Sequence, residues 1–285
     1  MSIQSQILPT SGEYPALEIQ RSGALGDASR PAILFLHGYT SGAWQFAEQA
    51  MPILAEDGWT SFALNLRGHG RSGGREGIRT ARFADYASDV ARAVAHIEGE
   101  TGQTPILGGH SLGSVLVRNY AARHAVPAIA LLSFGDIKLG MKGFMGWMIK
   151  RYPVQGMMGM LTGRPSAMFT KFGPQYDVMY AGHDRDAVRR NVERLMAQPD
   201  SDKVFMELGK LDLTQPVGNP PVFVMAGDRD PIASGGSVPA LARKLGTKAV
   251  MLPGQAHDIL AGPDWRTGVG HLRDWLNAQF PQVQS

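Results

Sequence analysis

Serine, aspartate and histidine can cooperate in nucleophilic catalysis, and in this sequence they occur in short polar stretches that follow apolar runs. The pattern Gly-x-Ser-x-Gly occupies residues 109–113, with Ser111 at its centre. An apolar run at 105–108 precedes it, and a helix-like run at 112–123 follows it. A serine at a sharp turn between a strand and a helix presents its hydroxyl to a substrate, and the first helical amide faces the charge that develops. The spacing therefore predicts Ser111 as a nucleophile and the Leu112 N–H as an oxyanion donor.

A serine hydroxyl is a weak nucleophile unless a base lies within hydrogen-bonding distance and an acid orients that base. His257 follows the apolar run at 249–252, where the last strand is expected. Functional side chains of a parallel α/β sheet gather at the carboxyl ends of its strands. His257 is therefore predicted to lie beside Ser111 and to take its proton.

Three aspartates are placed to orient the base. Asp228 and Asp230 follow the apolar run at 222–226, and Asp136 follows the run at 128–133. All three come just after the carboxyl end of an expected strand, the edge at which His257 is also expected. The positions alone leave Asp230, Asp136 and Asp228 open as the acid.

Apolar runs alternate with amphipathic segments along most of the chain. Continuous apolarity, as at 32–36, is typical of strands that are buried on both faces, and so of a parallel sheet between helices. A loose alternation at 16–20 predicts an edge strand, and the helical period of 83–98 predicts a long amphipathic helix. The expected fold class is α/β with a doubly wound, mostly parallel sheet. Further strands are expected at 60–66, 105–108, 128–133, 222–226 and 249–252, and further helices at 44–56, 112–123, 238–245 and 265–280.

The alternation is interrupted once, between residues 136 and 215, where the sequence is rich in methionine and has no strand pattern. This interruption predicts a helical cap, or lid, over 136–215, inserted into an α/β core formed by 1–135 and 216–285. Within the cap, helices are expected over 141–148 and 154–161, with Pro153 between them, and a third helix is expected to begin at Asp184.

Composition excludes several classes of function. The formal net charge is only +3, from 28 basic and 25 acidic residues, which argues against nucleic-acid binding. The absence of cysteine excludes disulfides, thiolate zinc sites and cysteine catalysis. No run of about 18 apolar residues and no signal-peptide pattern is found, so a cytoplasmic location is expected. No dinucleotide fingerprint follows a first strand, and neither a cofactor nor a metal is expected.

Five short segments carry a family resemblance when they are taken together. They are Leu36-His37-Gly38, Asn65 to Ser72, Gly109 to Gly113, Gly227 to Pro231 and Gly254 to His257. On these segments the sequence resembles the α/β-hydrolase superfamily from about Leu17 to Phe280. It is most similar to the branch of monoacylglycerol lipases, lysophospholipases and carboxylesterases. One departure is Asn65, where that branch more often has aspartate.

The resemblance implies an α/β-hydrolase fold with a helical cap inserted after the sixth strand. It also implies a serine esterase that forms an acyl-serine intermediate. The order Ser111, Asp230, His257 matches the order of the catalytic triad in this fold, with the acid directly before a proline. The backbone N–H of Tyr39 is implied as the second oxyanion donor, beside that of Leu112.

Some residues are expected to contact the substrate or to support those that do. His37 and His69 lie in the loops of the family motifs and are expected to brace the backbone near the site. His37, Gly38 and His110 are also candidate contacts of the substrate. In the cap, the flexible side chains of methionines suit an acyl-chain pocket. Phe144, Trp147, Met148, Met157 and Met158 are the candidate lining residues, although the same apolar faces could instead pack the cap onto the sheet.

Basic residues accompany these apolar faces. Lys142, Lys150 and Arg151 lie beside them in sequence, which suggests transient contact with a lipid interface. The expected substrate is a small apolar acyl ester. Alternatives that keep the triad are a thioesterase, a prolyl-type aminopeptidase, a carbon–carbon hydrolase, a lactonase or an acyltransferase. A ligand-binding homologue without catalysis is the alternative from another class.

Overall fold

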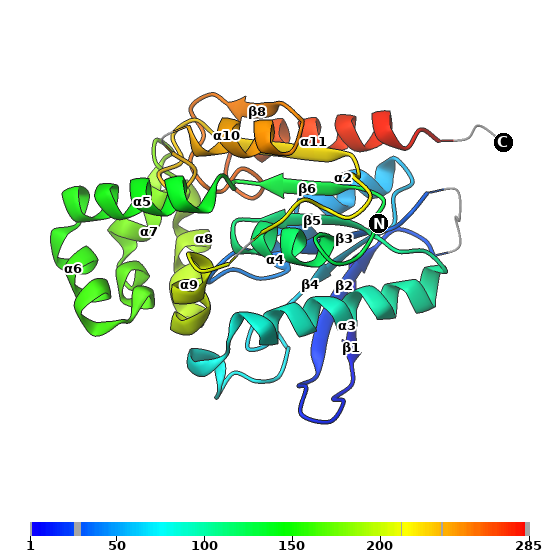
Figure 1. The fold of residues 1–285 in the computed structure, drawn as a ribbon, viewed down its shortest axis with the longest axis horizontal. Coiled ribbons are helices and arrows are strands. Elements are labelled where there is room, and N and C mark those ends of the chain that lie inside the picture. The colour runs from blue at the N-terminus through cyan, green and yellow to red at the C-terminus, as the bar shows by residue number, and fades with distance from the viewer. Residues whose placement is uncertain (1, 26–29, 212, 235, 283–285) are drawn as a thin grey trace.

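The computed structural model describes residues 2–25, 30–211, 213–234 and 236–282. In this part of the chain, eight strands form one sheet in the order β1-β2-β4-β3-β5-β6-β7-β8 (Figure 1). The strands from β4 to β8 pair in parallel, whereas β1 and β2 are antiparallel to their neighbours. The strands are β1 (Gln4–Leu8), β2 (Leu17–Ser22), β3 (Ile33–Leu36), β4 (Ser61–Leu64), β5 (Ile106–His110), β6 (Ile129–Leu132), β7 (Val222–Gly227) and β8 (Ala249–Leu252). The predicted class, a mostly parallel α/β sheet, is confirmed.

Helices cover both faces of the sheet because its central strands are apolar on both sides. Successive residues of β3 point to opposite faces: Leu34 and Leu36 belong to one core cluster, and Ile33 and Phe35 to another. Helices α3, α4 and α10 contribute to the first cluster, and α1, α2 and α11 to the second. These helices are α1 (Trp44–Ala47), α2 (Ala50–Glu56), α3 (Phe83–Thr101), α4 (Leu112–Ala121), α10 (Ser237–Lys244) and α11 (Trp265–Gln279).

The edge of the sheet differs from the prediction. The segment at 16–20 was expected to be an edge strand, but β2 lies between β1 and β4. The edge strand is β1, which pairs with β2 from Gln4 opposite Arg21 to Leu8 opposite Leu17. Most side chains of β1 are exposed, so its sequence carries no apolar alternation that would mark a strand.

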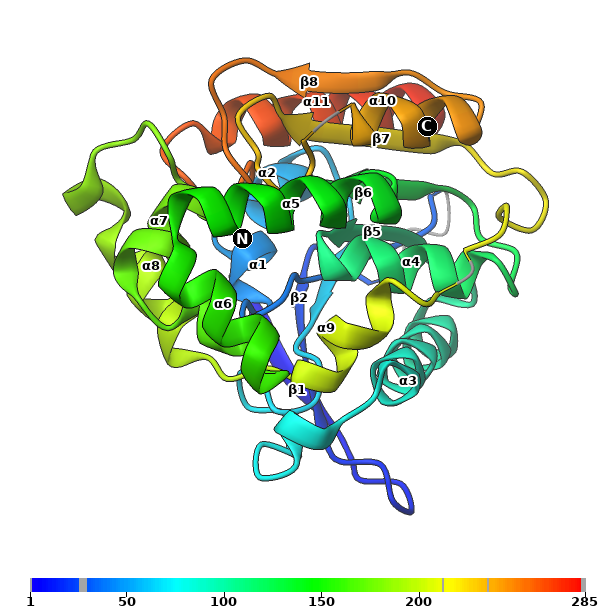
Figure 2. The same cartoon turned by 60° about the vertical axis from the view of Figure 1, so that its left-hand side comes forward.

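Five α-helices and a short 3₁₀ segment lie between β6 and β7. They are α5 (Ile137–Arg151), α6 (Pro153–Thr162), η2 (Pro165–Phe169), α7 (Phe172–Met179), α8 (Arg185–Ala197) and α9 (Asp202–Leu208). Figures 1 and 2 show them beyond the carboxyl end of β6, where they cover that end of the sheet. Asp184 caps α8 as predicted, since its carboxylate accepts the amides of Asp186 and Ala187. These helices fall within the predicted cap, 136–215, and are called the cap below.

Helix α6 is oriented differently from the prediction. Its apolar residues point to solvent, whereas its buried residues are Gly156 and Gly159. A Cβ atom at Gly159 would lie 2.7 Å from Cγ of Met168, so the α6 backbone packs closely against η2. The exposed side chains of α6 are those of Val154, Met157, Met158, Met160 and Leu161, and we call them the α6 face.

Candidate active site

Ser111 lies at the sharp turn between β5 and α4. Its φ is 52°, a conformation that is strained for any residue with a side chain. Two glycines make the turn possible: a Cβ at Gly109 would lie 2.3 Å from the carbonyl carbon of Gly113, and a Cβ at Gly113 would lie 2.0 Å from the Leu36 oxygen. The local sequence therefore forces Ser111 out of the sheet, beside the amide of Leu112 that begins α4.

His257 and Asp230 form a buried pair at the ends of β8 and β7. His257 Nδ1 lies 2.7 Å from Asp230 Oδ2. The other carboxylate oxygen of Asp230 accepts the amides of Ile232 and Ala233, at 2.8 and 3.1 Å. A carboxylate that already accepts these bonds takes a proton-bearing Nδ1 as its donor, which leaves Nε2 of His257 as the basic nitrogen.

The other two aspartates are engaged elsewhere. Asp136 caps α5 by accepting the Leu139 amide, and it also forms an ion pair with Lys244. Asp228 is exposed and accepts the amide of Gly254 at 2.7 Å. Of the three carboxylates considered, Asp230 is therefore the one that the structure places against His257.

The main-chain oxygen of His257 is held from two sides. Ser133 Oγ donates to it at 2.6 Å, and His110 Nε2 lies 2.9 Å from it. Gln45 Nε2 lies 3.1 Å from the other ring nitrogen of His110, so that nitrogen accepts and Nε2 donates. Burial and the neighbouring His257 lower the pKa of His110 to about 4, which keeps its ring neutral.

Residues 38–41 form a tight turn next to Ser111. The Ser41 amide donates to the Gly38 carbonyl at 3.2 Å, and the turn places Tyr39 and Thr40 at its corner. Thr40 has a φ of 56°, another strained value. The N–H groups of Tyr39 and Leu112 belong to residues that line the same pocket as Ser111 and His257.

His37 supports this turn from behind. Its Nδ1 lies 2.8 Å from the Gly38 carbonyl oxygen, and its Nε2 accepts the amide of Leu66 at 3.2 Å. Burial, reinforced by nearby His69, lowers the pKa of His37 to about 3. His37 does not line the pocket, so the structure places it as a brace and not as a substrate contact.

Asn65, the departure from the family pattern, connects strand β2 with the segment before α1. Its side-chain oxygen accepts the Ala43 amide at 2.8 Å, and its side-chain nitrogen donates to Glu18 at 2.8 Å. An aspartate here would place a second carboxylate against Glu18. The amide of Asn65 therefore suits this position, because its oxygen accepts one hydrogen bond and its nitrogen donates the other.

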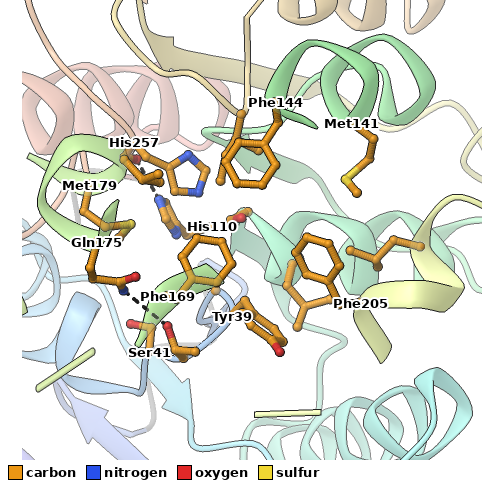
Figure 3. Close-up of a pocket in the computed structure, with 17 residues that line it drawn as sticks. Tyr39, Ser41, His110, Met141, Phe144, Phe169, Gln175, Met179, Phe205 and His257 are labelled. Atoms are coloured by element: carbon orange, nitrogen blue, oxygen red, sulfur yellow. Dashed lines mark hydrogen bonds between the residues drawn. The ribbon is translucent and has the colours of Figure 1, made fainter. Parts of the chain in front are cut away.

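The pocket above Ser111 encloses about 60 Å³ of free space and is mostly apolar (Figure 3). The cap supplies most of its apolar wall, including Met141, Phe144, Phe169, Met179 and Phe205. A second apolar pocket of about 50 Å³ shares Ser111, Leu112, Met141, Leu208 and Ile232 with the first. The nucleophile thus opens onto two adjoining apolar spaces.

One polar side chain stands in the cap wall of the main pocket. Gln175, on α7, is 2% exposed, and its side-chain nitrogen lies 3.5 Å from Thr40 Oγ1. Its side-chain oxygen is buried and has no partner in the described protein. The backbone N–H groups of His257 and Asp258 donate to the carbonyls of Val178 and Met179, which end the same helix. Gln175 therefore stands on the His257 side of the pocket (Figure 3).

Several predicted contacts are placed as expected, and others are not. Tyr39, Gly38, His110, Leu112 and Phe144 line the pocket. Besides His37, the candidates that do not line it are Trp147, Met148, Met157 and Met158.

These four side chains have other environments. Met148 is fully buried in the core of the cap, and Trp147 packs on the rings of Phe144 and Tyr152. Met157 and Met158 are 54% and 49% exposed on the α6 face. The prediction that they form the acyl pocket is corrected, because α5 and α6 direct these side chains elsewhere.

The sequence interpretation missed Phe169, Gln175, Met179 and Phe205. They come from α7, α9 and η2, which are too short to show a clear apolar period. Within the described ranges, no cluster of three or more histidine, aspartate or glutamate residues is arranged to hold a metal. No helix in those ranges is both long and apolar enough to cross a membrane.

The chain is similar in sequence to known proteins. The family model described as serine aminopeptidase, S33, matches residues 27–194. The monoacylglycerol lipase of Mycolicibacterium smegmatis is 24% identical over 270 residues, which cover 87% of this chain and 88% of that protein. Mouse protein phosphatase methylesterase 1 is 29% identical over 122 residues, which cover 43% of this chain and 30% of that protein.

Solved structures agree with the fold. A carboxyl esterase from Bacillus coagulans superimposes with a TM-score of 0.72 at 17% identity, over 98% of this chain and 99% of that chain. Epoxide hydrolase A from Mycobacterium thermoresistibile superimposes with a TM-score of 0.70 at 15% identity, over 97% of this chain and 98% of that chain. At these identities the likeness concerns the fold alone.

Proposed function

The chain belongs to the serine aminopeptidase S33 family of α/β-hydrolases, and from this premise we propose that it is a serine esterase for apolar acyl esters. One observation carries the proposal. Ser111, at a strained turn, and His257, whose Nδ1 lies 2.7 Å from Asp230, face the same apolar pocket. These positions support acyl transfer through a serine, in which a base beside the nucleophile takes its proton.

In the proposed reaction, Ser111 Oγ attacks the ester carbonyl carbon while His257 Nε2 takes the hydroxyl proton. The carbonyl oxygen becomes an oxyanion, which the N–H groups of Tyr39 and Leu112 stabilise. The tetrahedral intermediate then expels the alcohol, which receives its proton from His257, and an acyl-Ser111 ester remains. Water repeats the sequence: His257 takes its proton, the acid is released, and Ser111 regains its hydrogen. Asp230 stays ionised and orients the imidazole throughout.

The character of the pocket favours an ester over the amide of an aminopeptidase substrate. An aminopeptidase binds a free ammonium group, which a buried site must pair with an anion. Among the described residues that line the main pocket there is no aspartate or glutamate. Asp136 borders the adjoining pocket, but Lys244 already pairs with it. A neutral ester with an apolar acid fits this surrounding better.

We further propose that the alcohol part of the substrate carries a free hydroxyl, as in a monoacyl ester of a polyol. The leaving alcohol must lie toward His257, which protonates it, and Gln175 stands on that side. Its side-chain oxygen is buried without a partner, and such a group is costly unless a ligand satisfies it. The similarity to a monoacylglycerol lipase supports the same substrate class.

The α6 face supports transient contact with a lipid surface, which is the expected source of such esters. Val154 and Leu161 on this face are 68% and 79% exposed. Lys150 and Arg151, both exposed, end α5 one residue before α6 begins, and Arg151 also pairs with Asp177. An exposed apolar helix face flanked by basic residues suits an interface that contains anionic lipids. We propose this face as the membrane-proximal side of the enzyme.

The primary test is hydrolysis of p-nitrophenyl esters with acyl chains from two to sixteen carbons. Turnover that peaks at one chain length, and that Ser111→Ala abolishes, is the expected result. Turnover without any preference for chain length would agree with the serine mechanism but would contradict an acyl pocket. If no ester is cleaved at any length, the esterase proposal is wrong.

A further inference from the structure

Asp200 reaches from the cap to the turn that carries the oxyanion donor. It lies within the cap, between α8 and α9, and its carboxylate is fully buried. Oδ2 accepts the Thr40 amide at 2.7 Å and faces His69 Nε2 at 3.2 Å. Oδ1 accepts the Tyr86 hydroxyl at 2.5 Å and the Ser201 amide at 2.7 Å. A single buried carboxylate thus joins the cap, the core helix α3 and the 38–41 turn.

The ionised form of Asp200 is favoured despite its burial. Burial raises the pKa of this carboxyl, but the charge of His69 and the hydrogen bonds from His69, Tyr86 and Thr40 outweigh it and lower the pKa below its usual value. His69 Nδ1 faces the Arg67 carbonyl oxygen at 2.9 Å, so both of its ring nitrogens face acceptors. Thr40 N–H therefore donates to a charged acceptor, which makes a strong hydrogen bond.

Thr40 needs such a partner because its backbone is strained. A β-branched residue with φ of 56° is a clear outlier, at the third position of a turn that usually takes glycine or asparagine. In the absence of other constraints, the turn would relax toward a conformation that suits threonine. The relaxation would rotate the Tyr39–Thr40 peptide and, through the Cα of Tyr39, shift the Gly38–Tyr39 peptide, whose N–H is the proposed oxyanion donor.

We propose that Asp200 is a positioning residue through which the cap holds the 38–41 turn, and with it the Tyr39 N–H, in the geometry of the oxyanion hole. Asp200 does not line the pocket and touches no substrate. Its effect should therefore fall on the stabilisation of the transition state and not on substrate binding. This inference rests on the proposed serine mechanism, although not on the identity of the bond that is cleaved.

The experiment compares Asp200→Ala with Tyr86→Phe, a control that removes a hydrogen bond to the same carboxylate but leaves Thr40 paired. Two rates are measured: kcat for p-nitrophenyl butanoate, and the rate at which a fluorophosphonate reacts with Ser111. The phosphonate oxygen occupies the oxyanion hole, so the second rate reports the hole whatever the natural substrate is.

We expect Asp200→Ala to lower both rates roughly 30- to 300-fold, close to the effect of losing one oxyanion donor, with KM changed by less than about threefold. Tyr86→Phe should change both rates by less than about threefold. Adding Thr40→Gly to Asp200→Ala should raise both rates again by at least about tenfold, because glycine adopts a positive φ without strain. If Asp200→Ala does not fold, Asp200→Asn takes its place, with an expected loss of about tenfold because a neutral oxygen is a weaker acceptor.

Equal rates in Asp200→Ala and Tyr86→Phe, a loss that appears in KM alone, or no rescue by Thr40→Gly would each overturn the inference. The failure of the esterase proposal gives a different result. In that case the wild type reacts with the fluorophosphonate but cleaves no ester, and the fluorophosphonate rates of the variants still decide the role of Asp200. A wild type that does not react with the fluorophosphonate refutes both proposals.

Discussion

The Nε2 atom of His110 lies 2.9 Å from the main-chain oxygen of His257, so the residue before the nucleophile holds the residue that is proposed as its base. His110 stands within the Gly-x-Ser-x-Gly pattern, and its ring lies 4.8 Å from that of His257, centre to centre. The same turn that strains Ser111 therefore also fixes the position of the His257 loop. The segment 109–113 thus holds the nucleophile directly and holds the base through the hydrogen bond of His110.

Replacing His110 by phenylalanine tests this relationship. His110→Phe keeps a flat ring but removes the donor to His257 and one of the two acceptors of the Gln45 side-chain nitrogen, which retains Asp258. We expect a loss of about 1–3 kcal/mol in the free energy of unfolding, and a fall in kcat of about tenfold because Ser133 still holds the His257 oxygen. Urea unfolding and ester turnover measure the two effects. The control is His124→Phe at an exposed site, where the change in stability should stay within about 0.5 kcal/mol. Equal effects of the two substitutions would contradict the prediction.

Stability should fall as the solution becomes acidic. The pKa values of His37 and His110 are lowered to about 3 and about 4 in the folded protein, whereas both rings titrate near 6.5 in the unfolded chain. Between these values the unfolded chain binds more protons. Stability is therefore complete above pH 6.5 and decreases below it, by about 2 kcal/mol for each ring between pH 7 and pH 5. Urea midpoints across this range measure the slope. His110→Phe should show a shallower slope, and equal slopes would argue against a neutral buried His110.

The identity of the acid gives a third prediction. Asp230→Asn keeps the shape of the side chain but removes the charge that orients and stabilises the imidazolium, so kcat should fall about 10³- to 10⁴-fold. Asp228→Asn is the matched control, since Asp228 is exposed and binds the Gly254 amide. Its kcat should stay within about threefold of the wild type. Turnover of Asp230→Asn above a tenth of the wild-type value would show that another group orients His257.

The parts of the predicted site that the structure brings together are those that local sequence must encode. Ser111 needs glycines at positions 109 and 113, because side chains there would collide with neighbouring backbone. Asp230 and His257 follow apolar strands, whose ends meet at one edge of the sheet. Such constraints leave a pattern within a few residues, so the fold class and the positions of these groups could be derived before the structure was seen.

The parts that were missed depend on contacts between distant segments. Asp200 and Gln175 reach Thr40 across 160 and 135 residues, and neither lies in a recognisable motif. Strand β1 is exposed and so lacks an apolar pattern. Helix α6 has a regular apolar period, but periodicity does not tell whether a face meets protein or solvent. The small residues Gly156 and Gly159 were the signal for close packing on the opposite face.

The α6 face gives a prediction about membranes. Replacing Met157 and Met158 together by glutamate places two charges on this face, which should lower the partition onto vesicles of phosphatidylglycerol and phosphatidylcholine by at least about tenfold. Met251→Glu is the control, because Met251 is 36% exposed on β8, outside the cap. Co-sedimentation measures the binding of each protein. The absence of wild-type binding would refute lipid contact, and an equal loss in the control would assign the binding to net charge alone.

Gln175 gives a prediction about the alcohol of the substrate. The esters 2-hydroxyethyl butanoate and propyl butanoate have leaving groups of nearly the same size, but one ends in a hydroxyl and the other in a methyl group. A hydroxyl that donates to the unpartnered Gln175 oxygen should favour the first ester by about tenfold in kcat/KM. Gln175→Leu should abolish or reverse this preference, because leucine prefers the methyl group. The ratio of the two esters is measured within each variant, so any loss of folded protein cancels.

Met179→Leu changes an apolar residue of the same helix and pocket wall and should retain the preference. A wild-type ratio near one, or a ratio that Gln175→Leu leaves unchanged, would mean that Gln175 does not recognise the alcohol.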